Sequence, residues 1–107
     1  MTTKELLLKA ARVLKKRGWT TRALQDDKGQ VCAVGALAAV ATGYPTDTYA
    51  MEDDRTVRCA LRRILKAAGR PLSTPGQEWH GVVDWNNYAC QSKDEIIDVF
   101  TKAAALK

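Results

Sequence analysis

The chain has 107 residues, of which 46% are hydrophobic and 27% charged, with a formal net charge of +5. This length fits a single domain, residues 1–107, and this balance excludes a disordered or fibrous chain. The longest nearly uncharged apolar run, residues 31–41, falls well short of the roughly 20 residues that a membrane-spanning helix needs. We therefore expect a globular domain with no membrane segment.

The cysteines and the N-terminus indicate the cellular compartment. The sequence holds three cysteines and one histidine. An odd number of cysteines in a short chain argues against a disulfide framework, and their spacing is not that of a zinc site. The first residues have neither the apolar run nor the cleavage pattern of a signal peptide. We expect reduced thiols, no metal, no cofactor and a cytoplasmic location.

The first predicted helix begins after Thr2 and ends before Gly18. Thr2 followed three residues later by Glu5 is a capping box, and glycine commonly ends a helix. One face carries apolar residues at helical spacing, namely Leu6, Leu7, Ala10, Val13 and Leu14. The opposite face carries basic residues, namely Lys4, Lys9, Arg12, Lys15 and Lys16.

The next two segments are a polar connector and an apolar helix. Residues 19–30 contain a turn signal from Asp26 to Gly29, and a short β-hairpin is an alternative there. Residues 31–41 are apolar on every side, which is typical of a helix at the centre of a small domain. Gly43 is its predicted end.

Two further helices follow after a polar loop. Asp53 or Asp54 is expected to cap a third helix that ends at Gly69. Residues 82–85 form a short apolar segment of one or two helical turns, and a second capping box at Ser92 opens the last helix. The sequence therefore predicts an all-α fold, a compact bundle of about four helices around a central apolar helix.

Several short motifs follow one another in a fixed order along the chain. They are Arg12-Val13-Leu14, Gly18-Trp19, Val31-Cys32, Gly35-Ala36-Leu37 and Trp85-Asn86, followed by an acidic and apolar last helix. From about residue 11 to residue 104 this order resembles a small domain family of unknown function found in actinobacteria and their phages. The resemblance implies a phage or phage-like accessory protein with no established activity. The family pattern has aspartate at the position of Asn87, which puts in doubt any role there that needs a carboxylate.

The tryptophans and tyrosines divide into two groups. Trp19 and Trp85 are expected to close the ends of the core, with Asn86 hydrogen-bonded to a loop backbone. The predicted structural motif comprises Trp19, Cys32, Gly35, Trp85 and Asn86. The other aromatic residues in loops are candidates for an exposed contact surface, because aromatic side chains often anchor interfaces. They are Tyr44, Tyr49, Trp79 and Tyr88.

Cys32 raises the hypothesis of a cysteine hydrolase. It lies near the start of a helix, where the dipole lowers the pKa of a thiol. His80 would then be the base, with Asp84 or Asn86 as its orienting group. The position of Cys32 inside an apolar run favours the simpler interpretation, a buried thiol with a solvated loop histidine. We expect a protein that is not an enzyme and keep the hydrolase as an alternative.

Positive charge is concentrated in two stretches of the chain. Residues 1–22 hold seven basic and one acidic residue, and residues 53–70 hold six basic and two acidic residues. If the two helices pack side by side, their outer faces form one surface for nucleic-acid phosphates or an acidic partner. This predicted surface comprises Lys9, Arg12, Lys15, Lys16, Arg55, Arg58, Arg62, Arg63 and Lys66. The simpler interpretation is two solvated helix faces.

The sequence as a whole favours a non-catalytic binding or adaptor protein, encoded by a phage and acting on a host or phage macromolecule in the host cytoplasm. A protein partner is expected. Nucleic-acid binding through the two basic helices is the first alternative, and a cysteine hydrolase is the second. The exposed aromatic residues would serve a partner protein or a homodimer equally well.

Overall fold

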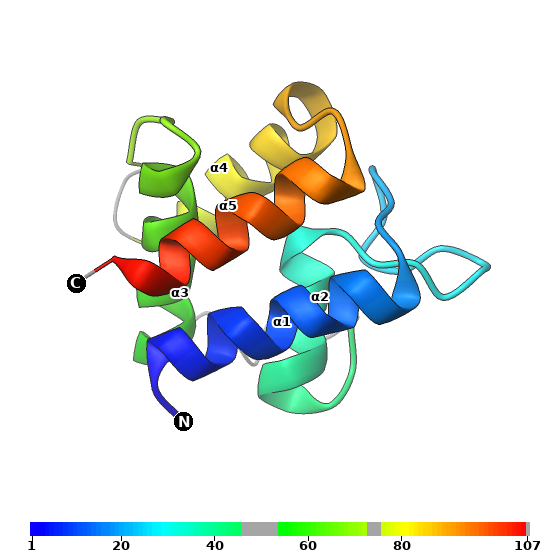
Figure 1. Ribbon diagram of the computed structural model, residues 1–107, viewed down its shortest axis with the longest axis horizontal. Helices are drawn as coiled ribbons and strands as arrows, with labels where there is room; N and C mark the ends of the chain where they lie inside the picture. The colour runs from blue at the N-terminus through cyan, green and yellow to red at the C-terminus, as the bar shows by residue number, and fades with distance from the viewer. Residues whose placement is uncertain (46–53, 73–75, 107) are drawn as a thin grey trace.

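Five α-helices and one π-helical turn make up the described part of the chain (Figure 1). The structure is a computed structural model that describes residues 1–45, 54–72 and 76–106. The elements are α1, Thr3–Arg17; α2, Ala33–Thr42; α3, Arg55–Ala67; α4, Glu78–Asp84; the π-helix η2, Trp85–Ala89; and α5, Lys93–Ala105. Helix α5 packs antiparallel along α1, and α3 crosses both at one end of the molecule (Figure 1). This confirms the predicted all-α bundle.

Helix α1 begins and ends at the predicted signals. The side-chain oxygen of Thr2 accepts a hydrogen bond from the backbone N–H of Glu5 at 3.1 Å, which satisfies a free donor of the first turn. Gly18 ends the helix with a φ of 95°, a conformation that favours glycine, and its N–H donates to the carbonyl of Leu14. The apolar face of α1 is buried against α2, α3 and α5.

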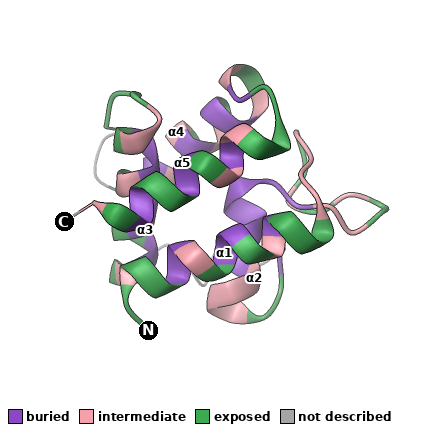
Figure 2. Ribbon diagram, viewed as in Figure 1, coloured by how far each residue is buried: buried purple, intermediate pink, exposed green. Residues whose placement is uncertain are grey.

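Helix α2 is enclosed by the core, as its apolar sequence predicts. Every residue from Ala33 to Ala38 is buried, and α1 and α4 pack against the helix (Figure 2). The helix begins at Ala33 because Cys32 is its N-cap, and it ends at Gly43 with a φ of 88°. A central apolar helix is therefore confirmed.

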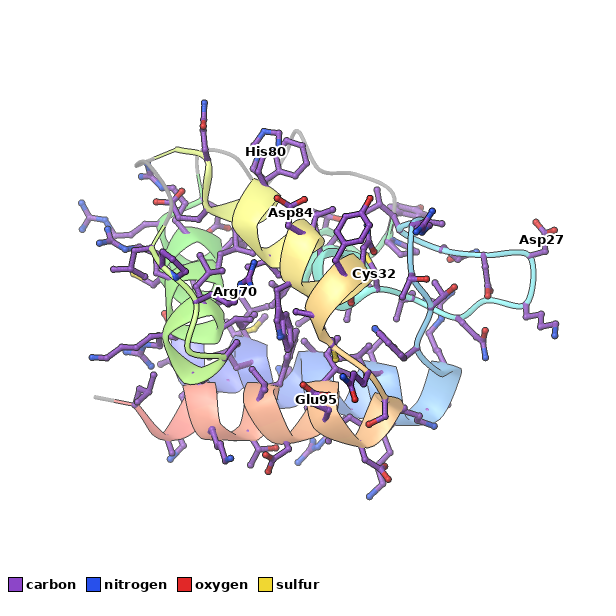
Figure 3. The ribbon with its side chains drawn as sticks, turned by 90° about the horizontal axis from the view of Figure 1, so that it is seen from above. Asp27, Cys32, Arg70, His80, Asp84 and Glu95 are labelled. Atoms are coloured by element: carbon purple, nitrogen blue, oxygen red, sulfur yellow. The ribbon has the colours of Figure 1, made fainter. Side chains whose placement is uncertain are left out.

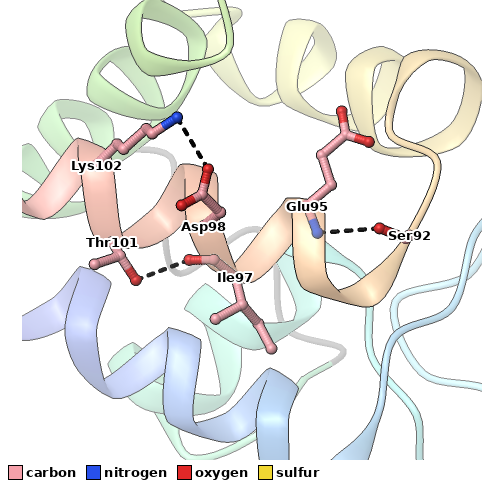
Figure 4. A network of polar contacts seen from close by, with 6 residues as sticks. All are labelled: Ser92, Glu95, Ile97, Asp98, Thr101 and Lys102. Atoms are coloured by element: carbon pink, nitrogen blue, oxygen red, sulfur yellow. Dashed lines mark hydrogen bonds and ion pairs between the residues drawn. The ribbon is translucent and has the colours of Figure 1, made fainter.

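Helix α5 begins at the second predicted capping box. The hydroxyl oxygen of Ser92 accepts a hydrogen bond from the backbone N–H of Glu95 at 3.1 Å (Figure 4). On the exposed side of the helix, Lys102 and Asp98 form the one ion pair found within the described ranges, at 3.0 Å (Figure 4). Both side chains of this pair are exposed, so it contributes little to stability.

Two sequence predictions need correction. The connector does not form a hairpin. Among the described residues it makes only isolated bridges from Val31 to Trp19 and to Gln25, and the carboxylate of Asp26 accepts hydrogen bonds from the backbone N–H groups of Lys28 and Gln30. The short apolar segment at 82–85 is part of a longer helical stretch, α4 and η2, because polar residues on either side also take helical conformation. The described part thus has five α-helices where the sequence indicated about four.

Candidate functional site

Asn86 joins the connector to the π-helical turn. It is 1% exposed, and its Oδ1 accepts hydrogen bonds from the indole N–H of Trp19 at 2.8 Å and from the backbone N–H of Ala33 at 3.0 Å. Its Nδ2 donates to the carbonyl of Thr20 at 3.3 Å and to Oδ1 of Asn87 at 3.0 Å. All four hydrogen-bonding positions of this carboxamide are therefore used inside the protein.

The next two residues of η2 are Asn87, which contacts the connector, and Tyr88, which is exposed to solvent. Oδ1 of Asn87 also accepts a hydrogen bond from the backbone N–H of Arg22 at 2.8 Å. Arg22 has a φ of 66°, in the left-handed region that a non-glycine residue rarely adopts. Its guanidinium carbon lies 5.5 Å from the centre of the ring of Tyr88, within cation–π range. Arg22, Asn87 and Tyr88 thus form one contact group at the surface.

Gly35 allows the connector to lie directly on the first turn of α2. A Cβ atom at this position would stand 2.1 Å from the carbonyl oxygen of Leu24. The same carbonyl accepts a hydrogen bond from the N–H of Cys32 at 3.4 Å. Close backbone approach, and not a left-handed conformation, is therefore the physical reason for glycine here.

These contacts shape a hollow between the connector, the start of α2 and the helical stretch α4–η2, which we call the Trp79 hollow. Its volume is about 290 Å³. Its lining residues are Arg22, Ala23, Leu24, Cys32, Trp79, Val83 and Asn87. Tyr88 is 73% exposed and stands beside it through its contact with Arg22. The hollow is mostly apolar inside, with one guanidinium and one aromatic ring at its edge.

The thiol of Cys32 lies in this hollow as a buried N-cap. Its Sγ accepts a hydrogen bond from the backbone N–H of Gly35 at 3.3 Å, and the residue is 5% exposed. Burial raises the pKa of the Cys32 thiol and outweighs the lowering effect of the backbone N–H groups at the helix start. The lowered pKa on which the hydrolase alternative depended is therefore wrong, and the thiol is buried, as the surrounding apolar run indicated.

His80 lies on the outer side of α4, away from Cys32 (Figure 3). It is exposed, and its ring centre is 3.7 Å from that of Trp79. Among the described residues, no hydrogen bond joins His80 to Cys32, Asp84 or Asn86. The buried amide of Asn86 is already saturated by the connector. The structure does not assemble these four residues into a nucleophile, base and orienting group.

Helix α3 presents its basic residues on one exposed side. The side chain of Asp54 caps it, accepting from the backbone N–H groups of Thr56 and Val57. Arg55, Arg58, Arg62 and Lys66 are exposed, whereas Arg63 is half-buried. A second hollow of about 260 Å³, which we call the arginine hollow, is lined by Arg55, Arg58, Cys59, Arg62 and Glu78. Glu78 comes from the start of α4 and is 4% exposed.

The basic residues of α1 lie elsewhere. Lys9, Arg12, Lys15 and Lys16 are all exposed. However, α1 meets α3 near its N-terminal end, where Leu6 and Val57 line a common hollow. Because the helices cross there, Lys15 and Lys16 lie at the far end of α1 (Figure 1). The structure therefore separates Lys15 and Lys16 from the basic residues of α3.

The predicted aromatic residues are not all together. Trp79 and Tyr88 lie at the Trp79 hollow, while Tyr44 follows α2 and is 70% exposed. Tyr49 lies outside the described residues. Trp85 is buried in the core, and the partly buried Trp19 packs against that core.

Sequence reasoning missed two groups of residues, those that shape the Trp79 hollow and the buried carboxylate of the arginine hollow. They are Arg22, Leu24, Val83, Asn87 and Glu78. Only Asn87, next to the Trp85-Asn86 motif, carried any signal.

The fold is that of a small all-α domain, with the Trp79 hollow at the start of its central helix α2. The chain belongs to a family of unknown function, DUF6197, which it matches over residues 1–106. The predicted membership of a domain family of unknown function is thereby confirmed. No curated protein and no solved structure matches the chain. In the part of the chain that the structure describes, no helix is long and apolar enough to cross a membrane.

Proposed function

We propose that this chain is a non-catalytic binding protein whose Trp79 hollow receives an apolar side chain of a partner protein. Trp, Tyr and Arg are the residue types that most often dominate binding energy at protein interfaces. All three gather here, as Trp79, Tyr88 and Arg22. A volume of about 290 Å³ is at the lower end of the range for ligand pockets, which suits one inserted side chain better than a cofactor.

The observation that carries the proposal is the unfavourable backbone geometry around the hollow. Arg22 adopts a left-handed conformation, and residues Trp85–Ala89 form a π-helical turn. A residue held in such a region costs about 1–3 kcal/mol, and π-helical turns often occur at functional sites. The side chains of Asn86 and Asn87 hold both features in place. Such geometry supports a surface selected for binding.

The resemblance to a family found in actinobacteria and their phages supports a partner from the host or the phage. The partner is a host or phage protein, and the encounter takes place in the host cytoplasm. The chain acts as an adaptor or effector and performs no chemistry. The burial of Cys32, the nucleophile of the hydrolase alternative, and the raised pKa of its thiol support this.

The test is an affinity pull-down from host lysate, with and without nuclease. It compares the wild-type chain with Tyr88→Ala and with the matched control Tyr44→Ala. The two tyrosines are 73% and 70% exposed, but only Tyr88 lies beside the hollow. Loss of an interface anchor costs about 2 kcal/mol, so Tyr88→Ala should weaken partner binding roughly 30-fold. Tyr44→Ala should change it less than about twofold.

Two outcomes would contradict the proposal. One is recovery that disappears on nuclease treatment or falls equally in both tyrosine variants. The other is a wild-type homodimer, detected by light scattering, that Tyr88→Ala converts to monomer. That result would assign the hollow to a second copy of this chain.

A further inference from the structure

The exposed side of α3 carries a continuous ridge of cations, independent of the Trp79 hollow. Arg55, Arg58, Arg62 and Lys66 follow one another at intervals of three, four and four residues, which places them on one side of the helix. We call this set the arginine ridge. At 1.5 Å per residue its ends are about 16 Å apart. That length follows about five nucleotides of one duplex strand, at 3.4 Å each.

The ridge differs in composition from a protein-binding surface. From Arg55 to Ala67, all of which the structure describes, the large apolar side chains are on the buried side, namely Val57, Leu61, Ile64 and Leu65. Within this helix, Cys59 is the one exposed residue that does not belong to the ridge. Protein interfaces usually have an apolar or aromatic centre. Exposed apolar surface borders the ridge at one end, where Leu72 lines a recess with Arg62 and Lys66, and the middle of the ridge has none from its own helix. A ligand here would have to be recognised by charge.

The helix bears an electrostatic cost for this arrangement. Arg55–Arg58, Arg58–Arg62 and Arg62–Lys66 are neighbouring like charges, and each such pair destabilises a helix. Arg55 also stands in the first turn of α3, where the helix dipole disfavours a cation, and the described acidic group at that end, the N-cap Asp54, is hydrogen-bonded to the backbone of Thr56 and Val57. A polyanion along the ridge would remove both effects.

Three of the four ridge residues also border a shaped recess. Arg55, Arg58 and Arg62 line the arginine hollow, where the guanidinium group can hold phosphate oxygens in two parallel hydrogen bonds. The described carboxylate in the hollow is Glu78, whose Oε2 accepts a hydrogen bond from the backbone N–H of Gly76 at 2.9 Å. It offsets one positive charge and leaves the hollow cationic.

We propose that the arginine ridge binds the phosphodiester backbone of a nucleic acid without reading its bases. The repeat of cations along a straight helix matches the regular linear array of phosphates in a nucleic-acid strand. A carboxylate can form the same bidentate pair with a guanidinium, so the regular spacing of the anions, and not the geometry of a single pair, favours the phosphodiester backbone. This second binding function does not rest on the Trp79 hollow.

The experiment measures fluorescence anisotropy of labelled 20-mer DNA, single-stranded and duplex, with the full chain between 50 and 200 mM salt. Wild type is compared with Arg58→Gln/Arg62→Gln and with the charge-matched control Lys15→Gln/Lys16→Gln on α1. Four phosphate contacts predict that log Kd depends on log salt with a slope of about 3–4. The α3 variant should bind at least tenfold more weakly and lose about two units of slope. The α1 control should change affinity less than threefold.

Other measurements separate this site from its alternatives. Trp79→Ala should leave DNA binding unchanged even if partner binding is lost, and far-UV circular dichroism should show that all variants fold. Equal losses in the two charge-matched variants would overturn the proposal, because net charge alone would then explain binding. So would affinity that does not depend on salt. Displacement of DNA by poly-glutamate as effectively as by unlabelled DNA would instead assign the ridge to an acidic protein.

Discussion

The Trp79 hollow and the arginine ridge are built in opposite ways. The hollow depends on hydrogen bonds between residues distant in sequence, such as Trp19 with Asn86 and Arg22 with Asn87. The ridge depends on the periodicity of one helix, whose charged residues recur once per turn. The shape of the hollow should therefore be lost when the connector is displaced, whereas the charge of the ridge should survive as long as α3 remains docked. Substitutions that act on one surface and spare the other test this difference.

The largest expected effect is that of Asn86→Ala. It removes the acceptor for the indole of Trp19 and the backbone of Ala33, and the donor to Thr20. Leaving buried polar groups unpaired costs about 1–3 kcal/mol each, so we expect the free energy of unfolding to fall by about 4 kcal/mol. Urea denaturation followed by tryptophan fluorescence measures it. Asn87→Ala, the control, removes contacts of a half-buried residue and should cost only about 1 kcal/mol. Equal losses would mean that Asn86 does not hold the connector.

Gly35→Ala should have the next largest effect. Its methyl group would stand 2.1 Å from the carbonyl oxygen of Leu24, so the connector must move away from α2. Overpacking of this kind typically costs about 1–3 kcal/mol, and it should open the Trp79 hollow without touching α3. Gly69→Ala is the control, since that position has a φ of 72° and nothing within 4 Å of an added Cβ. It should lose only about 1 kcal/mol. Partner binding should fall in the Gly35 variant alone, and retained binding there would contradict the assigned packing.

The cysteines report which parts of the two sites solvent can reach, because Cys59 lines the arginine hollow and Cys32 lines the Trp79 hollow. Cys59 is exposed beside the arginine ridge, whereas Cys32 and Cys90 are buried. Burial raises the pKa of the Cys90 thiol to about 11 and also raises that of Cys32. With iodoacetamide near neutral pH, mass spectrometry should show Cys59 modified at least tenfold faster than the other two. DNA should protect Cys59. Faster modification of Cys32 than of Cys59 would revive the hydrolase alternative.

The sequence predicted the features that depend on local chemistry. Capping boxes at Thr2 and Ser92 and the glycine after each of the first two helices marked helix ends correctly, because these signals act within one turn. The basic character of α3 was equally visible. The fully apolar run at 31–41 correctly indicated a central helix, although Cys32 became its cap.

Features that depend on tertiary contacts were missed. The left-handed conformation of Arg22 could not be predicted from the residues around it. The side chain that accepts a hydrogen bond from its backbone N–H belongs to Asn87, which is 65 residues away in the sequence. The π-helical turn likewise depends on where the connector meets Asn86. For Cys32 the sequence carried two opposing signals, a helix start that lowers the pKa of the thiol and an apolar run that buries it, and in the structure the effect of burial is the larger one. The Trp79 hollow could therefore be found only from the structure. The arginine ridge could be found from the sequence, because the spacing of its residues along one helix is enough to place them on one side.

The smallest expected effect is a change in the free energy of unfolding that has opposite signs for substitutions on α3 and on α1. Arg58→Gln/Arg62→Gln removes like-charge neighbours along α3 and should raise the free energy of unfolding by about 1 kcal/mol at low salt. Lys15→Gln/Lys16→Gln removes cations from the last turn of α1, where they favour the helix dipole, and should lower it by about 0.5 kcal/mol. Urea denaturation at 20 mM and at 1 M salt measures both, and the differences should largely vanish at 1 M. A loss of stability in the α3 variant would mean that its arginines make favourable contacts within the fold. The electrostatic cost that motivates the nucleic-acid proposal would then not exist.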